Sequence, residues 1–87
     1  MKNKEGIVAI DLFCGAGGLT HGFVTEGIKV IAGIDSDSSC KFPYEKNNPS
    51  LFIEKDVTDV KGDMIKDLYP SKSVKVLVGC APCQTFS

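Results

Sequence analysis

The chain has 87 residues, 43% of them apolar and 24% charged, which suits one globular domain and excludes a two-domain or disordered chain. Its longest apolar runs, about six residues, are too short to cross a membrane, and we expect a cytoplasmic protein without a signal peptide. Ten lysines scattered among eleven acidic residues, no arginine and a net charge of −1 exclude the basic face of a protein that holds duplex DNA by itself.

The first part of the chain reads as a strand, a tight turn, a helix and a second strand. Residues 7–13 are an apolar, β-branched run that ends at Gly-Ala-Gly-Gly, residues 15–18, which we call the glycine turn. Residues 19–26 carry apolar side chains on one side and predict a helix. Residues 29–34 predict a second buried strand, closed by Asp35.

The second part repeats this alternation. Residues 38–47 predict a weaker helix, in which Pro43 causes a kink or a late start. Residues 51–54 predict a third strand, residues 64–68 a short helix and residues 74–79 a fourth strand. Strands alternating with helices imply right-handed βαβ units. We therefore expect an α/β, Rossmann-like three-layer α/β/α fold, with four strands of a partial doubly wound parallel sheet.

The remaining apolar residues receive structural interpretations. We interpret Phe42, Tyr44 and Phe52 as packing residues, and Cys14 and Cys40 as small core fillers. The predicted fourth strand is apolar, and nothing that follows it covers its outer edge. An uncovered edge invites pairing, so a complementary chain or self-association is expected there.

Residues with binding or catalytic chemistry follow each predicted strand. Ligands of open parallel sheets bind beyond the carboxyl ends of the strands. The glycine turn lets a ligand approach the backbone, although a plain strand-to-helix turn has the same pattern. Asp35 follows Gly15 by 20 residues, near the offset at which an acid meets ribose hydroxyls; a helix N-cap is the alternative. Together they indicate an adenosine-containing ligand.

The third and fourth strand ends carry Asp56 and Cys83. Asp56 suits an adenine amino group, or is a solvated loop carboxylate. Cys83, fixed by Pro82, is a candidate nucleophile, or a buried inert cysteine. Cys80 and Cys83 also have the spacing of a thioredoxin-like redox pair, which would not need the glycine turn or Asp35. A nicotinamide-dinucleotide module is a further alternative, although the full glycine fingerprint is missing.

Two segments resemble signatures of the cytosine-5 DNA methyltransferases. Residues 11–18, Asp-Leu-Phe-Cys-Gly-Ala-Gly-Gly, resemble the first, and residues 82–87, Pro-Cys-Gln-Thr-Phe-Ser, resemble the one that carries the nucleophile. Asp35 and Asp56 are similar to two further family residues, in the same order. The resemblance implies that residues 1–87 are the N-terminal part of the catalytic domain, with the target-recognition region and later motifs absent.

The resemblance also implies a cofactor, S-adenosylmethionine, and no metal. Phe13 would lie against the adenine, Asp35 would take the ribose hydroxyls and Asp56 the adenine amino group. Ser36 stands where many relatives carry a larger apolar residue against the adenine. The other implied cofactor-binding residues are Gly15, Ala16, Gly17, Gly18 and Leu19, whose backbone would hold the methionine part, and Val57.

For the reaction, the resemblance implies that Cys83 adds to carbon 6 of a flipped-out cytosine, so that carbon 5 can take the methyl group. Pro82 and Gln84 would shape the loop of Cys83, and Ser87 would lie near the DNA backbone. DNA would be held by regions missing here, within a restriction-modification context. We expect the isolated chain not to methylate DNA. A tRNA cytosine-5 methyltransferase and a subunit of a split methyltransferase stay open as alternatives.

Overall fold

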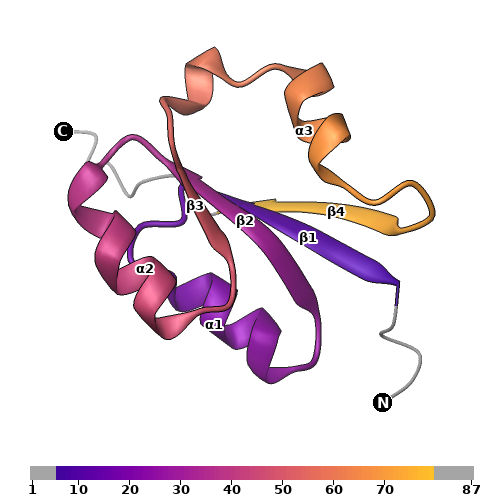
Figure 1. Cartoon of the computed structure of the whole chain (residues 1–87), viewed down its shortest axis with the longest axis horizontal. Coiled ribbons are helices and arrows are strands. Elements are labelled where there is room, and N and C mark those ends of the chain that lie inside the picture. The colour runs from indigo at the N-terminus through magenta and orange to yellow at the C-terminus, as the bar shows by residue number, and fades with distance from the viewer. Residues whose placement is uncertain (1–5, 80–87) are drawn as a thin grey trace, which may run out of the picture.

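The computed structural model describes residues 6–79, and these residues form one parallel sheet with helices on both faces (Figure 1). The strand order is β3-β2-β1-β4, and every neighbouring pair is parallel. The elements are β1 (Ile7–Leu12), α1 (Gly18–Thr25), β2 (Lys29–Asp35), α2 (Lys41–Asn47), β3 (Leu51–Glu54), α3 (Gly62–Leu68) and β4 (Val74–Gly79).

The order of the strands reverses at β1. The chain moves outward from β1 to β2 and β3, and then returns through α3 to place β4 on the other side of β1. Figure 1 shows α1 and α2 below the sheet and α3 above it. Right-handed crossovers place helices on opposite faces when the direction of winding changes. The predicted three-layer α/β/α fold with a partial doubly wound parallel sheet is therefore confirmed.

The core lies around β1 and β2. Fully buried side chains on these strands include Ile10, Val30 and Ile34. Because β1 lies between β2 and β4 and is covered on both faces, it needs an apolar run rather than an alternating pattern. Tyr44 from α2 and Phe52 from β3 complete this core, with ring centroids 5.8 Å apart. Their interpretation as packing residues is confirmed.

Helix α2 begins late, as Pro43 predicted. A 3-10 turn at Ser38–Cys40 precedes it, and the α-helix begins at Lys41. Pro43 then lies in the first turn, where a backbone N–H would have no partner within the helix. The interpretation of Phe42 as a packing residue is wrong, because its side chain is 72% exposed. Residues two apart on a helix point to nearly opposite sides, so Phe42 faces outward where Tyr44 faces inward.

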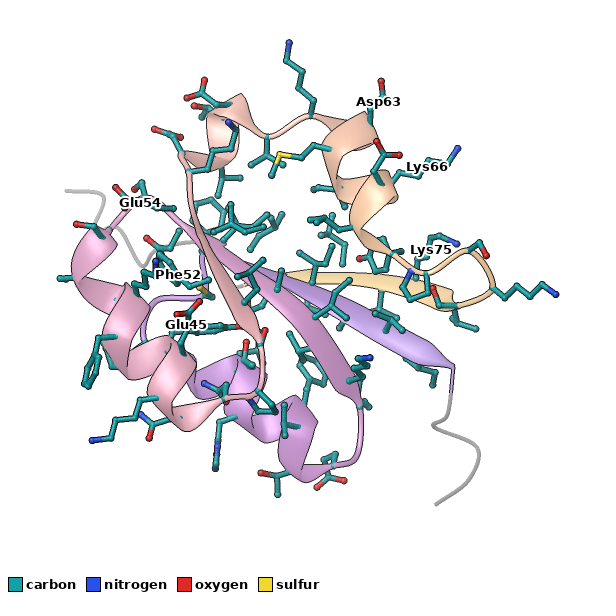
Figure 2. All side chains as sticks on the ribbon, in the orientation of Figure 1. Glu45, Phe52, Glu54, Asp63, Lys66 and Lys75 are labelled. Atoms are coloured by element: carbon teal, nitrogen blue, oxygen red, sulfur yellow. The ribbon has the colours of Figure 1, made fainter. Side chains whose placement is uncertain are left out.

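Side chains also fasten the edge strands. Figure 2 shows Glu45 and Phe52 close together, where a Glu45 carboxylate oxygen accepts a hydrogen bond of 2.9 Å from the Phe52 backbone N–H. At the opposite edge the Tyr69 hydroxyl donates to the Val76 carbonyl. No helix within residues 6–79 combines the length and apolar character needed to span a bilayer. The same residues contain no cluster of three or more His, Cys, Asp or Glu side chains suited to a metal ion.

Candidate cofactor-binding site

The glycine turn reverses the chain between β1 and α1 through left-handed backbone conformations. Phe13, Gly15 and Gly17 have φ angles of 57°, 53° and 98°. Among the described non-glycine residues, Phe13 alone has a positive φ, which costs roughly 1–3 kcal/mol and is typical of functional sites. Its side chain is 37% exposed, so the ring stands at the surface beside the turn. This arrangement leaves the Phe13 ring available to a ligand.

The interior of the turn is fixed by backbone hydrogen bonds. The Cys14 N–H donates to the Ile34 carbonyl over 3.2 Å, and the Gly17 N–H donates to the Cys14 carbonyl over 2.9 Å. Cys14 is buried, as predicted, and burial raises the pKa of its thiol to about 12. A thiol with this pKa stays protonated at neutral pH, so Cys14 serves packing rather than chemistry.

Asp35 connects the end of β2 to the glycine turn. One carboxylate oxygen accepts a hydrogen bond of 2.9 Å from the Gly15 N–H, and the other accepts one of 3.0 Å from the Asp37 N–H. The N-cap of the following 3-10 turn is Asp37, which accepts from the Ser39 N–H and hydroxyl. The alternative of Asp35 as that helix cap is therefore wrong. Each Asp35 oxygen retains a second lone pair for a ligand.

Asp56 follows β3 and caps a 3-10 turn at Val57–Asp59. Its Oδ1 atom accepts from the Thr58 N–H over 2.9 Å and from the Thr58 hydroxyl over 2.7 Å. These bonds stabilise the ionised form and lower the pKa of Asp56. The side chain is exposed, while Val57 is half-buried beside it. Asp56 is thus an ionised surface acceptor at the end of the third strand.

The structure brings the predicted residues of the first three strands to one rim of the sheet. Asp35 is in register with Glu54, so Asp56 follows at the next strand end. The Lys55 N–H also donates to the Asp35 carbonyl over 3.0 Å. Ser36 is exposed on the same rim, beside Asp35. The turn after β1 lies next to β2, and Gly79 at the end of β4 is in register with Leu12.

The predicted nucleophile lies beyond the part of the chain that the structure describes. Strand β4 was predicted correctly at residues 74–79 and pairs with β1. The residues named in the sequence predictions that fall outside the described range are Cys80, Pro82, Cys83, Gln84 and Ser87.

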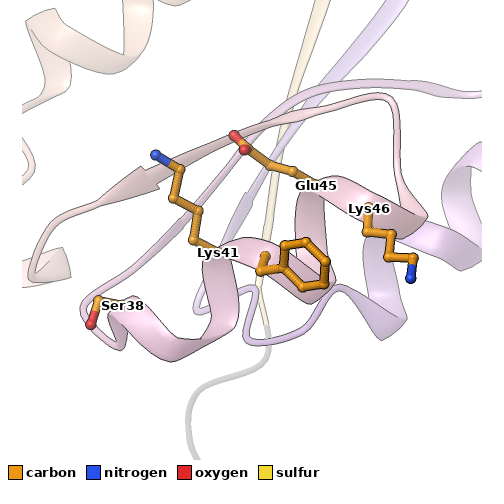
Figure 3. Close-up of a pocket in the computed structure, with 5 residues that line it drawn as sticks. Ser38, Lys41, Glu45 and Lys46 are labelled. Atoms are coloured by element: carbon orange, nitrogen blue, oxygen red, sulfur yellow. The ribbon is translucent and has the colours of Figure 1, made fainter.

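A hollow lies beside the glycine turn. It has a volume of about 430 Å³ and is lined by residues 16–18 of the turn, His21, Asn47 and Asn48. Leu19, in the first turn of α1, is 43% exposed. A larger hollow of about 690 Å³ lies on the outer side of α2, among Lys41, Glu45 and Lys46 (Figure 3). The larger hollow contains none of the predicted binding residues, so size does not identify the site here.

Sequence reasoning missed a buried polar chain beneath the turn. The Thr20 hydroxyl donates to an Asp11 carboxylate oxygen over 2.7 Å, and lies 3.0 Å from the Tyr44 hydroxyl, which is 2.7 Å from the Ser50 hydroxyl. Asp11 is 1% exposed, and this desolvation raises the pKa of its carboxyl group, with a smaller opposing contribution from the Thr20 hydrogen bond. The signal in the sequence was an acidic residue within an otherwise apolar strand.

The reversal of strand order at β1, with a glycine turn and acidic strand ends on one rim, defines a Rossmann-like α/β domain. The C-5 cytosine-specific DNA methylase family model matches residues 7–87. The chain belongs to this family.

Individual relatives agree with the family. The chain is 60% identical over 78 residues to the type II methylase M.HgiDII of Herpetosiphon aurantiacus, covering 90% of this chain and 22% of that protein. It is 36% identical over 83 residues to the type II methyltransferase M.XorII of Xanthomonas oryzae pv. oryzae, covering 92% of this chain and 20% of that protein. The chain thus spans about a fifth of the length of these two curated relatives.

Proposed function

We propose that this chain forms the S-adenosylmethionine-binding part of a DNA methyltransferase that methylates carbon 5 of cytosine. The main support is the hydrogen bond from the Gly15 N–H to Asp35, which joins the turn after β1 to the acid after β2. The match of the family model over residues 7–87 adds to it. The family description supports DNA as the substrate, and the type II relatives support a place in restriction-modification. A cytoplasmic location is part of the same proposal.

The donor set fits this cofactor. Helix α1 has Gly17 at its N-cap, with no capping side chain and no acidic residue in its first turn, so its first N–H groups suit the methionine carboxylate. A Cβ atom built on Gly15 or Gly18 would meet nothing within 4 Å, so a ligand can approach the backbone there. The carboxylates of Asp35 and Asp56 are acceptors suited to ribose hydroxyls and an adenine amino group.

Each implied residue then has a role toward the cofactor. Phe13 would contact the adenine face, and residues 15–19 would hold the methionine part through their backbone. Asp35 would accept from the ribose hydroxyls, with exposed Ser36 next to it. Asp56 would accept from the adenine amino group, and half-buried Val57 would pack beside the ring. When bound, S-adenosylmethionine supplies the methyl group that carbon 5 receives.

Cys83 is proposed as the catalytic nucleophile toward cytosine. Its thiolate would add to carbon 6, which gives carbon 5 the electron density needed for methylation. Loss of the proton from carbon 5 and departure of the thiolate would restore the aromatic ring. Pro82 and Gln84 would shape this loop, and Ser87 would lie near the DNA backbone. The base must leave the DNA stack for this chemistry.

Among residues 6–79, β4 is an edge strand with no partner on its outer side, which supports a split or multi-part enzyme. Val74 is 62% exposed and Leu77 is 51% exposed on this strand. The chain also spans about a fifth of its two named relatives, whose remaining length exceeds it severalfold. We propose that a further strand of the methyltransferase, from a complementary chain or from continued sequence, pairs with β4. DNA binding would come mainly from that remainder, because the chain carries a net charge of −1.

Calorimetric titration of the chain with S-adenosylhomocysteine tests the cofactor assignment. We expect binding by the wild-type chain and at least about tenfold weaker binding by Asp35→Ala, because two acceptor oxygens are lost. Asp37→Ala is the matched control, because Asp37 caps the neighbouring 3-10 turn and makes no hydrogen bond to the glycine turn among the described residues. Equal affinities for the wild-type and Asp35→Ala chains would contradict the assignment.

A further inference from the structure

Four polar groups from different segments form a continuous chain beneath the glycine turn. They are the carboxylate of Asp11 on β1 and the hydroxyls of Thr20 on α1, Tyr44 on α2 and Ser50 before β3. Asp11, Thr20 and Tyr44 are each 0–1% exposed. Burying polar groups this deeply costs free energy unless they are hydrogen-bonded. The hydrogen bonds between these four side chains therefore constrain how α1 and α2 pack on the sheet.

The direction of the hydrogen bonds follows from the number of protons. A hydroxyl group has one proton, and Thr20 donates its proton to Asp11 over 2.7 Å. In the 3.0 Å contact with Tyr44, Thr20 must therefore accept, and the Tyr44 hydroxyl must donate. Tyr44 then accepts from Ser50 over 2.7 Å. All three hydroxyl groups therefore donate toward Asp11, and the bond from Thr20 offsets only part of the burial that raises the pKa of its carboxyl group.

The ring of Tyr44 fills the space between two glycines. A Cβ atom on Gly17 would lie 2.7 Å from the Tyr44 Cδ1 atom, and one on Gly33 would lie 2.5 Å from its Cζ atom. Gly17 belongs to the glycine turn and Gly33 to β2, two residues before Asp35. The ring therefore packs close to the backbone at Gly17 and Gly33, each two residues from one partner of the Gly15–Asp35 hydrogen bond.

We propose that Thr20 and Tyr44 are positioning residues of the cofactor site, which hold the glycine turn in the shape that presents the Gly15 N–H to Asp35. The Tyr44 ring supports the turn from below, and the Thr20 hydroxyl joins α1 to β1 through Asp11. Neither residue needs to touch the cofactor in this role. The inference rests on the proposed function, because it assigns a purpose to the turn.

Substitutions at Thr20 separate a positioning role from simple packing. Thr20→Val keeps the shape and removes the hydroxyl, whereas Thr20→Ser keeps the hydroxyl and removes a methyl group. We expect Thr20→Val to weaken S-adenosylhomocysteine binding at least about tenfold, and Thr20→Ser to stay within about threefold of wild type. Tyr44→Phe, which keeps the ring, should give an intermediate loss. Thr25→Val is the matched control, because the exposed Thr25 hydroxyl donates to the His21 carbonyl on the same helix.

Amide hydrogen exchange provides a measurement that needs no ligand. The Gly17 N–H bonds to the Cys14 carbonyl, so its protection reports the shape of the turn. Thr20→Val should speed Gly17 exchange at least about tenfold relative to the amides of β2, with no such change in Thr25→Val. Failure of the wild-type chain to bind S-adenosylhomocysteine would contradict the proposed function. Amide hydrogen exchange at Gly17 would still test the positioning role of Thr20 in that case. Equal effects of Thr20→Val and Thr20→Ser, or uniform acceleration across β2 and the turn, would overturn the inference.

Discussion

The region from β1 to β3 and the region of α3 and β4 differ in how many of their side chains are buried. All the fully buried residues of the described chain fall between residues 8 and 52, in the region of β1, α1, β2, α2 and β3. Helix α3 and strand β4 contribute no fully buried side chain. Asp63 and Lys66 on α3 and Lys75 on β4 project outward, as Figure 2 shows. Strand β4 is attached mainly through its backbone pairing with β1.

This difference separates the two parts of the proposed enzyme. The rim that would hold the cofactor stands on the buried core, so its geometry is fixed by side chains within this chain. The strand that leads toward Cys83 has an exposed edge and exposed apolar residues, so it depends on whatever covers it. Within the described residues, buried side chains thus support the proposed cofactor rim more firmly than they support β4, the strand that precedes the proposed nucleophile in the sequence.

Gly17→Ala should cause the largest loss of stability, because it places a methyl group in the tightly packed glycine turn. The new Cβ would lie 2.5 Å from the Asn48 Nδ2 atom and 2.7 Å from the Tyr44 ring, at a φ of 98° that side chains disfavour. We expect a loss of about 3 kcal/mol or more in the free energy of unfolding, measured by urea denaturation. Gly22→Ala is the control on the same helix: its Cβ meets nothing within 4 Å, and it should stabilise the chain by about 0.5–1 kcal/mol. Equal effects would mean that the turn is not packed as described.

A matched pair of valines compares the two sides directly. Val30 on β2 is 1% exposed and Val74 on β4 is 62% exposed. We expect Val30→Ala to lower the free energy of unfolding by about 2 kcal/mol, through lost burial and a residual cavity. Val74→Ala should change it by less than about 0.5 kcal/mol. A large loss from Val74→Ala in the isolated chain would show that β4 is covered in solution, for example by a second copy.

The smallest expected effect is a change in how stability depends on pH. Burial raises the pKa of Asp11 above its ordinary value of 3.8, so its contribution to stability is full below that value and is lost as the pH rises through the folded pKa. Asp11→Asn should remove this fall in the free energy of unfolding with rising pH. We expect the fall to be smaller than the loss of stability caused by Val30→Ala. Unfolding of both proteins measured from pH 4 upward provides the comparison.

Two surface acids give stability the opposite pH dependence, but they do not affect the comparison of wild type with Asp11→Asn. Hydrogen bonds from Ser39 and Thr58 lower the pKa of Asp37 and Asp56, so their contributions are lost as the pH falls. Both acids are present in wild type and in Asp11→Asn, and the difference between the two proteins isolates Asp11. An unchanged pH dependence in Asp11→Asn would show that Asp11 does not titrate as a buried acid.

The order of the elements could be predicted because it depends on local signals, and all bounds except the start of α2 lie within two residues of those predicted. An apolar run that stops at glycines predicted β1, and Pro43 predicted the late start of α2. Because the carboxyl ends of parallel strands share one rim, the placement of the glycine turn, Asp35 and Asp56 followed as well. The assignment of Cys83 stays a prediction, since it lies outside the described residues.

By itself, the sequence determined the alternating strands and helices, the rim and the family, since these depend on short apolar runs, glycines and contiguous motifs. Only the tertiary structure decided that Asp37 caps the turn after β2, that Phe42 faces outward, and that Tyr44 fills the space beneath the turn. The polar chain joins residues that are 9 and 24 positions apart, on elements whose relative placement depends on how the helices pack. Contacts of this kind follow from three-dimensional packing, which no local pattern of residues encodes.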